Sequence, residues 1–355
     1  MQSKSRDLFV DFFRGAIIID MILVHFRRYL PNILGRLINF ADIAIEGFVF
    51  ISGFMLGKHY LDKFKVSKKE VTKRLLLRSP KLAVIHYVLI ITIALPFYQY
   101  FEPKSYRELI YFILSSFLFL NQHPIFHILP TFIPLFIISP IILVMLGRNW
   151  DYRLIFASIT VFLVGCYNPY IFNLGEKTIF PAVLWQIYFV LGSLVGKLSK
   201  NTGIKISNKM LLYGVLLYSF ALIVKYGGYF DAIDRIKSAY EIYPKKFPLN
   251  TYGVLYGCSF LFLLYTIINR LWEIMNKYRL VTVFVPLLGR NSLLAFVVHV
   301  YFVYLAKSLD RIGFNSSLVS ISIVVCLYFI YIIVYHIEKK TERDSMPLIY
   351  MRLFS

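Results

Sequence analysis

Charged residues are scarce in this sequence. They make up 16% of its 355 residues, whereas a soluble globular domain carries about 25%. Acidic residues are the scarcer kind, with 19 Asp and Glu against 39 Lys and Arg. Long apolar segments recur along the chain, and segments of about 20 apolar residues are typical of membrane helices. The shortage of charge therefore argues against a soluble globule and indicates a protein that crosses a membrane several times.

Cysteine is also scarce. The three cysteines, Cys166, Cys258 and Cys326, are scattered through apolar segments, a spacing that fits neither a disulfide framework nor a metal site. The sequence also lacks a zinc-ligand pair, a glycine-rich phosphate loop and a nucleophile elbow. We therefore expect buried, inert thiols, no metal and no tightly bound cofactor.

Hydrophobic residues make up 58% of the chain, and hydropathy windows of about 19 residues predict ten membrane-spanning helices. The first contains charges and lacks a small-residue cleavage site, so we expect a membrane helix rather than a cleavable signal peptide. No internal repeat is visible. We expect one all-α integral membrane domain over residues 1–355. The predicted spans lie near 8–27, 39–57, 79–97, 128–146, 152–167, 179–198, 209–226, 251–271, 284–307 and 316–336.

The net charge of +20 is concentrated in short connections between apolar segments. This placement favours positive-inside topology and contact with anionic lipid over binding of nucleic acid. If the ambiguous segment 107–121 does not cross the membrane, all five basic segments fall on one side and both termini are cytoplasmic. We therefore predict ten spans, with 107–121 interfacial or re-entrant on the outer side and a long outer loop near 227–250. The basic segments are 58–81, 147–153, 196–209, 269–279 and 336–344.

The first span carries ionisable residues at membrane depth, where each is costly and usually faces a bundle interior or a wet cavity. Arg14 and His25 are eleven residues apart, so they share a helix face about 16 Å apart along the axis. His25 is therefore a candidate general base. Asp20 points away from His25, and we expect it to serve packing or ion pairing.

The second predicted span places Asp42 and Glu46 four residues apart, on one helix face and at the outer level of His25. A carboxylate beside a histidine orients the imidazole and stabilises its protonated form, as a general base requires. Glu46 is the candidate for this function. A structural pair that neutralises two buried charges is the alternative.

The third span opens with Arg74, Arg78 and Lys81, which form a cationic stripe at positions i, i+4 and i+7. Arg and Lys clusters of this kind bind phosphates. The alternative is an anchor whose cations reach out of the membrane at the cytoplasmic face.

Two later segments carry polar groups at membrane depth. Trp185 and Gln186 lie in an apolar span, where an unpaired amide would be costly. Ser292 and His299 share a helix face, seven residues apart. Helix capping accounts for Asn291 and Ser292, whereas His299 is a candidate for substrate binding, together with Asp42, Trp185 and Gln186.

These motifs together resemble the OpgC-type branch of the acyltransferase-3 superfamily, the succinyltransferases of periplasmic glucans. Arg14 and His25 take the positions of the Arg-X10-His signature of that superfamily. Arg78 and Lys81 fall where it has Arg-X-X-Arg, with lysine replacing the second arginine. The segments EGFVFISGF, HILPTFIPLFIISPIIL, FPAVLWQIYFVLGSLVG and LLGRNSLLAF also occur in the order of the family.

The resemblance implies a multi-pass protein of the bacterial inner membrane that takes an acyl group, succinyl or acetyl, from cytoplasmic acyl-CoA. The acceptor would be a hydroxyl of a periplasmic or cell-surface glycan. On this reading His25, Glu46 and Arg14 serve catalysis, and Arg74, Arg78 and Lys81 hold the CoA phosphates. The alternative is a transporter or flippase for a glycan or a small anionic metabolite. Paired halves with broken helices would favour transport, and the sequence shows no such repeat.

Overall fold

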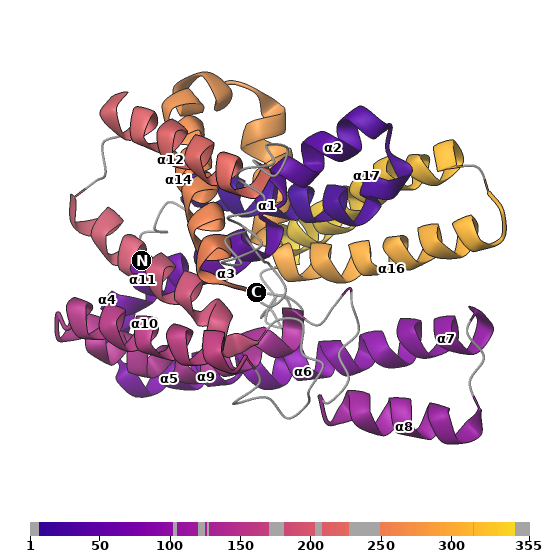
Figure 1. Cartoon of the computed structure of the whole chain (residues 1–355), viewed down its shortest axis with the longest axis horizontal. Helices are drawn as coiled ribbons and strands as arrows, with labels where there is room; N and C mark the ends of the chain where they lie inside the picture. Colours follow the sequence, from indigo (N-terminus) through magenta and orange to yellow (C-terminus); the bar gives the residue numbers. More distant parts are fainter. Residues whose placement is uncertain are drawn as a thin grey trace, which may run out of the picture. The chain divides into compact units, whose positions relative to one another are not determined.

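A computed structural model describes residues 7–101, 105–119, 125, 128–169, 181–202, 208–226, 249–314 and 316–344 (Figure 1). These residues form helices and no β-strand, which confirms the all-α class. The predicted outer loop near 227–250 lies almost wholly outside the described residues. The chain divides into two compact units. The first comprises residues 1–45, 91–103 and 271–355, and the second comprises 46–90 and 104–270.

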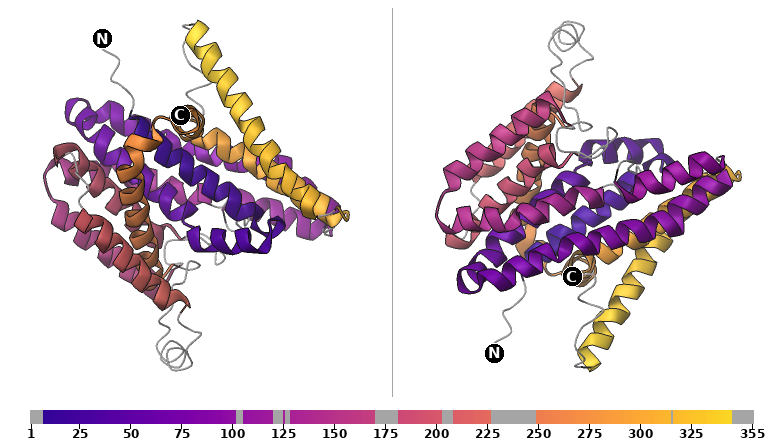
Figure 2. Two further views of the ribbon diagram at one scale, coloured as in Figure 1. Left: turned by 90° about the horizontal axis from the view of Figure 1, so that it is seen from above. Right: turned by 90° about the horizontal axis from the view of Figure 1, so that it is seen from below.

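The first unit brings together helices from both ends of the chain. Within it, α16 packs against α17, the long yellow helix in both views of Figure 2. Its elements are α1 (Leu8–Phe26), the 3-10 turn η1 (Arg27–Tyr29), α2 (Asn32–Ala41), α7 (Leu95–Phe101), the π-helical turn η5 (Leu280–Phe284), α15 (Val285–Arg290), α16 (Ser292–Arg311) and α17 (Ser316–Asp344).

The second unit is built around α9 and α11, and Figure 1 shows α5, α9 and α10 side by side. Its elements include α3 (Ala44–Met55), the π-helical turn η2 (Leu56–Tyr60), α4 (Leu61–Val66), α5 (Lys68–Leu76), α6 (Arg78–Leu89), α8 (Tyr106–Phe117), α9 (Ile128–Gly147), α10 (Asp151–Tyr167), α11 (Ala182–Thr202), α12 (Asn208–Tyr226) and α14 (Thr251–Met275). A third π-helical turn, η3 (Ile90–Ala94), joins α6 to α7.

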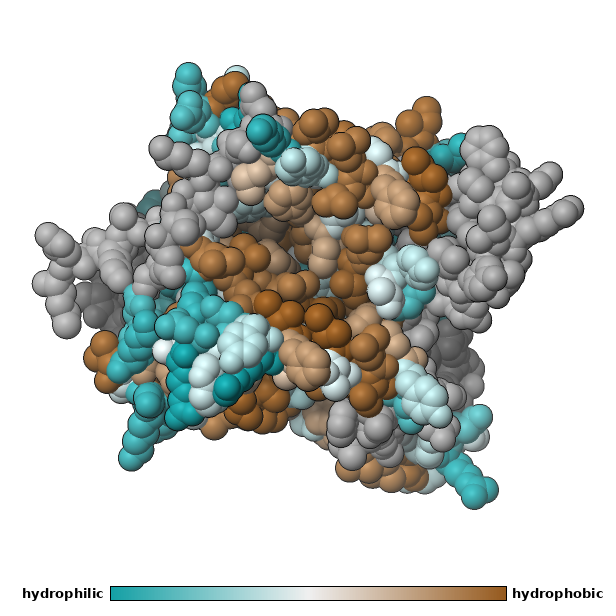
Figure 3. Space-filling model, turned by 60° about the vertical axis from the view of Figure 1, so that its left-hand side comes forward, coloured by the Kyte–Doolittle hydropathy of each residue, from teal (hydrophilic) through white to brown (hydrophobic). Residues whose placement is uncertain are grey.

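Six helical segments of the described chain are long and apolar enough to cross a membrane. Large apolar side chains are exposed along such helices, among them Ile141 and Val324. Figure 3 shows hydrophobic side chains over much of the face it draws, with hydrophilic ones gathered in separate patches. Such exposed apolar surface is typical of a membrane protein. The six are Lys68–Phe97, Ile128–Gly147, Ala182–Ser199, Thr251–Met275, Ser292–Arg311 and Val319–Ile337. The count of ten crossings stays a prediction.

Two predicted spans are not single helices. In the segment 39–57, α2 ends at Ala41 and α3 begins at Ala44. In the segment 284–307, α15 ends at Arg290 and α16 begins at Ser292. Hydropathy alone does not divide either segment, although the expected caps Asn291 and Ser292 already place a helix start at the second break.

The ambiguous segment 107–121 contains α8, which has 12 residues. At about 1.5 Å per residue this helix is roughly 18 Å long, well short of a hydrocarbon core of about 30 Å. A capping box at Ser105 and Glu108 fixes where it starts, because each side chain accepts a hydrogen bond from the backbone N–H of the other residue. A helix of this length favours an interfacial or re-entrant segment over a crossing one.

Paired glycines bring α3 and α11 into backbone contact in the second unit. A Cβ atom added to Gly53 would lie 1.9 Å from the carbonyl oxygen of Phe189, and one added to Gly192 would lie 2.0 Å from that of Phe50. Gly57, in the π-helical turn η2 that continues α3, and Gly196 on α11 repeat the arrangement four residues further along. Small residues spaced four apart allow this close approach in membrane proteins.

A buried lysine ties the end of α9 to the start of α10. The Nζ atom of Lys197, on α11, donates to the Leu146 carbonyl at 3.0 Å and to the Asn149 side chain at 2.9 Å, and it lies 2.7 Å from the Asp151 carboxylate. Lys197 is 7% exposed. The Leu146 carbonyl, in the last turn of α9, has no partner within the helix and accepts from both Lys197 and the backbone N–H of Asn149.

Candidate active site

The position of α1 in the first unit is set by close packing against α15. A Cβ atom on Gly15 would lie 1.9 Å from the carbonyl oxygen of Val285, and one on Gly289 would lie 1.8 Å from that of Asp11. The two backbones therefore touch where both residues are glycine. Because α16 follows α15 after one residue, this packing also brings α16 beside α1.

Two polar contacts join α1 to α16. The guanidinium of Arg14 donates to the Ser292 hydroxyl at 2.8 Å. The imidazoles of His25 and His299 approach to 3.0 Å between Nδ1 of His25 and Nε2 of His299, with their ring planes within 8° of parallel. The structure thus brings three of the predicted site residues, Arg14, His25 and His299, to one interface within the first unit.

These contacts show that α1 and α16 run in the same direction, because Arg14, His25 and Arg28 meet Ser292, His299 and Asp310 in chain order. In the ten-span prediction these helices both run outward. If 107–121 crossed the membrane, they would run in opposite directions. The observed direction therefore favours a topology in which 107–121 does not cross the membrane.

His299 is wholly buried, whereas His25 is half-buried. Nδ1 of His299 lies within hydrogen-bond distance of the Phe296 carbonyl oxygen, one turn earlier on α16. The ring of Phe296 also packs edge-on against the imidazole, at 5.2 Å between centroids. Both nitrogens of His299 therefore have partners inside the protein.

The prediction that Asn291 and Ser292 stand at a helix start is confirmed, but their side chains do not cap the helix. Asn291 occupies the N-cap position of α16, but its side chain makes no capping hydrogen bond. Its amide instead donates to the Leu287 carbonyl at 3.2 Å. The Ser292 hydroxyl accepts from Arg14. The Ser292 hydroxyl thus contacts α1 instead of a backbone N–H at the start of α16.

The break between α2 and α3 contains Asp42 and is contacted by Asp20 of α1. The Asp20 carboxylate accepts a hydrogen bond of 3.2 Å from the backbone N–H of Ile43, just before α3 begins. A negative side chain is favourable at a helix start, where backbone N–H groups lack partners. Asp42 is half-buried and occupies the C-cap position of α2. Asp20 therefore has a structural contact with a backbone N–H, where packing or an ion pair was expected.

Glu46 begins the second unit and is 3% exposed. A Cβ atom on Gly257 would lie 2.9 Å from Cγ of Glu46 and 2.2 Å from the hydroxyl of Tyr188. Glu46 and Tyr188 thus converge on the space left by this glycine. The indole of Trp185 lies 5.7 Å from the Tyr188 ring, centroid to centroid, which brings two predicted site residues to the same region. The pairing of Glu46 with His25 stays a prediction.

Gln186 has a structural partner in the second unit. Its carbonyl oxygen accepts from the Ser158 hydroxyl at 2.7 Å, and its amide donates to the Ser158 carbonyl at 2.8 Å. This reciprocal pair joins α11 to α10 and satisfies an amide that would be costly unpaired in a membrane. Its contact with a substrate stays a prediction.

The cationic stripe lies where α5 passes into α6. Arg78 donates to the Tyr60 hydroxyl at 2.7 Å, and its guanidinium lies 5.3 Å from the ring centroids of both Tyr60 and Phe136. Arg74 is exposed and pairs with Glu70 one turn earlier on α5. Lys81 is half-buried. The guanidinium of Arg78 is therefore fixed by its contacts with Tyr60 and Phe136, whereas Arg74 lies at the surface.

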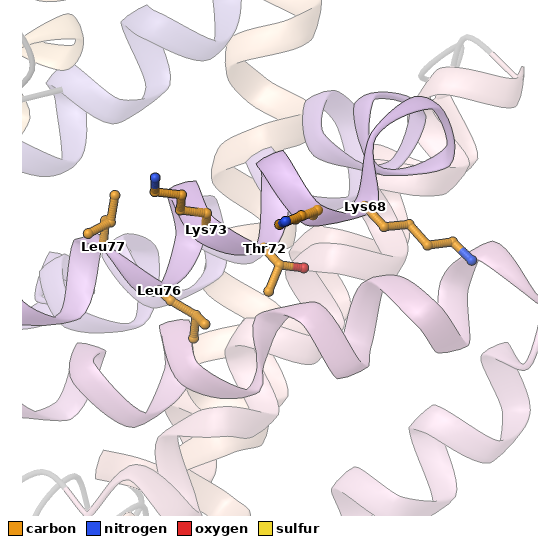
Figure 4. A pocket seen from close by; sticks show the side chains of 6 residues that line it. Lys68, Thr72, Lys73, Leu76 and Leu77 are labelled. Carbon is orange, nitrogen blue, oxygen red and sulfur yellow. The ribbon is translucent and has the colours of Figure 1, made fainter.

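An open groove of about 550 Å³ runs along α5 next to this stripe (Figure 4). Lys73 and Leu77 project from one side of the helix and Thr72 and Leu76 from the other. The sequence places these residues in the basic segment 58–81 but does not single them out as site residues. The groove is lined by Lys68, Lys69, Thr72, Lys73, Leu76 and Leu77.

The fold and the site define an all-α protein, consistent with membrane insertion, in which a half-buried and a buried histidine meet at a helix interface. The chain belongs to the OpgC protein family, whose model matches residues 6–342. Membership suggests, in general terms, a membrane enzyme that transfers a group in glucan modification. No curated protein and no solved structure gives a significant match.

Proposed function

We propose that this protein is a membrane O-acyltransferase of the bacterial inner membrane, with both termini cytoplasmic. It moves a succinyl or acetyl group from cytoplasmic acyl-CoA to a hydroxyl of a periplasmic or cell-surface glycan. The observation that carries this proposal is the contact of His25 with His299, on the same two helices as the Arg14–Ser292 pair, in a member of the OpgC family. A titratable imidazole at membrane depth is the kind of group that such a transfer requires.

The proposed reaction is a direct attack. The acceptor hydroxyl gives its proton to His25, and its oxygen forms a bond to the thioester carbonyl carbon of the donor. The carbon–sulfur bond then breaks, and the CoA thiolate takes the proton back from the imidazolium. General-base help of this kind is worth about 10²–10⁴-fold in rate.

The donor would bind through its phosphates at Arg74, Arg78 and Lys81. Arg78 supports this proposal, because Tyr60 and Phe136 hold its guanidinium in a fixed position and a guanidinium matches phosphate geometry well. The lysines of the adjacent groove add positive charge on α5. A cluster of positive charges attracts an anionic substrate and raises its local concentration.

The remaining predicted residues are proposed to serve the acceptor side. Glu46 would accept a hydrogen bond from a hydroxyl of the sugar, and Asp42, Trp185 and Gln186 would also contact the sugar. Trp185 and Glu46 support this assignment, because both approach Tyr188 in the second unit. An aromatic ring beside a polar group is a common way to bind a polar ligand with an apolar face.

The test uses purified protein in detergent, succinyl-CoA and acetyl-CoA in competition, and a glucan acceptor. We expect a glucan heavier by a succinyl group, with release of free CoA thiol. A product heavier by an acetyl group alone would show that the protein transfers acetyl and not succinyl. If neither donor gives a modified glucan, and labelled glucan crosses proteoliposomes that contain the protein, the protein is a transporter or flippase.

The Arg78→Ala variant is expected to bind a non-hydrolysable acyl-CoA analogue roughly 10- to 150-fold more weakly, since one charge-assisted contact is worth about 1.5–3 kcal/mol. Titration calorimetry would measure this dissociation constant. Arg78→Lys keeps the charge but loses the planar guanidinium, so its affinity for the analogue should lie between those of the wild type and Arg78→Ala.

Arg153→Ala is the matched control, because it removes an exposed arginine that stacks on Trp150 in the same unit. Its affinity should equal that of the wild type. An unchanged dissociation constant in a folded Arg78→Ala protein would show that the stripe does not bind the donor and would favour the alternative, an anchor at the cytoplasmic face.

A further inference from the structure

We propose that His299 is a positioning residue that fixes the tautomer of His25. This inference rests on the proposed acyl transfer and names a residue through which His25 becomes a base. The two imidazoles come from α1 and α16, 274 residues apart in sequence, and meet at 3.0 Å between Nδ1 of His25 and Nε2 of His299.

The proton on His299 is assigned by its backbone contact. The Phe296 oxygen is a carbonyl, so it can only accept a hydrogen bond, and Nδ1 of His299 must be the donor. A neutral imidazole protonated at Nδ1 carries its lone pair on Nε2. A doubly protonated His299 would place a charge on a side chain with no exposed surface, which is expensive without a compensating partner.

The tautomer of His25 follows from that of His299. Because Nε2 of His299 is an acceptor, Nδ1 of His25 must donate to it. Nε2 of His25 is then the nitrogen with the lone pair, and it is the atom that can take a proton from an acceptor hydroxyl. In hydrolases a carboxylate holds the catalytic histidine in this way. Here a neutral histidine occupies the place next to Nδ1.

This arrangement also changes what is expected of His299 and Glu46. Both nitrogens of His299 are engaged inside the protein, so His299 acts on His25 rather than on the acceptor sugar. Nδ1 of His25, which an orienting carboxylate would take, already contacts His299. Glu46 is therefore assigned to the acceptor and not to the orientation of His25.

The kinetic test compares three substitutions in α16. His299→Phe keeps a ring but loses the acceptor, and we expect kcat to fall by about 10²-fold or more with KM for acyl-CoA unchanged. His299→Gln places a carbonyl oxygen near the position of Nε2, and kcat should recover to within about 10-fold of the wild type. Val303→Ala, which opens space at a buried site one turn away, is the control for packing and should leave kcat unchanged.

The spectroscopic test reads the tautomer directly and does not depend on activity. The chain has 7 histidines, so ¹⁵N-histidine labelling gives few signals, and His25→Gln identifies the one from His25. We expect a proton on Nδ1 of His25 in the wild type and loss of this preference in His299→Phe. A proton on Nε2 in the wild type would overturn the inference, as would equal kcat in the wild type and His299→Phe. If no donor supports transfer, the proposed function fails, and the ¹⁵N spectra still decide the tautomer.

Discussion

Replacement of His25 by alanine is expected to reduce acyl transfer by about 10²–10⁴-fold, because the acceptor hydroxyl would lose the group that takes its proton. The variant should insert and fold, since His25 is half-buried and its contact with His299 is one polar contact among the packed helices of the first unit. Acylated glucan formed per unit of purified protein, followed by mass spectrometry, measures the loss.

His336→Ala is the matched control for this experiment. His336 also lies on a helix of the first unit, but it is exposed, with its ring against Tyr335. Its activity should match the wild type. Donor affinity should be unchanged in His25→Ala, because the proposed phosphate contacts come from Arg74, Arg78 and Lys81. Transfer within a few-fold of the wild type would remove His25 from the mechanism.

The helices themselves could be predicted from sequence with good accuracy. The predicted spans 152–167 and 209–226 correspond to α10 and α12, with ends that differ by one residue at most. Apolar segments of this length have few alternatives to a helix in a membrane, because every backbone group must be satisfied within the segment. Local composition is therefore enough to predict that such an element exists.

The shared faces of the site were also predictable, but the pairing between them was not. The spacing of Arg14 and His25 places both on one face of α1, and that of Ser292 and His299 does the same on α16. Nothing in the sequence says that these two faces meet. Their contact depends on Gly15 and Gly289, which let α15 approach α1.

The break in the predicted span 39–57 also depends on a tertiary contact that the sequence does not reveal. The segment NFADIAIEG contains no proline, and its glycine lies beyond the break. The Ile43 N–H finds the carboxylate of Asp20, 23 residues earlier. A tertiary partner for one backbone group thus marks the start of α3, and no local propensity carries that information.

The glycine pairs of α3 and α11 did leave a sequence signal. Gly53 and Gly57 are four apart, and so are Gly192 and Gly196. This small-xxx-small pattern is typical of membrane helices that pack closely. Read together, the two motifs predict a contact that hydropathy windows do not reveal.

The Gly192→Leu substitution is expected to prevent recovery of a folded protein. Even the first side-chain atom would lie 2.0 Å from the Phe50 carbonyl oxygen and 3.0 Å from the Phe54 backbone nitrogen. These are backbone atoms, so no rotamer change can relieve the clash, and α3 must move away from α11. Size-exclusion chromatography of the detergent-solubilised protein should show aggregate in place of a single peak.

Gly192→Ala makes the same point with a smaller change. Overpacking by one methyl group typically costs about 1–3 kcal/mol, which corresponds to a fall in Tm of roughly 1–4 °C for a chain of this size. Gly147→Ala is the control, because the nearest atom to its Cβ would be a Leu61 side-chain carbon at 3.9 Å, and its Tm should not fall. A Gly192→Ala protein as stable as the wild type would show that α3 and α11 are not in backbone contact. Because Glu46 lies on α3 and Trp185 on α11, loss of that contact would also separate the two residues proposed to serve the acceptor.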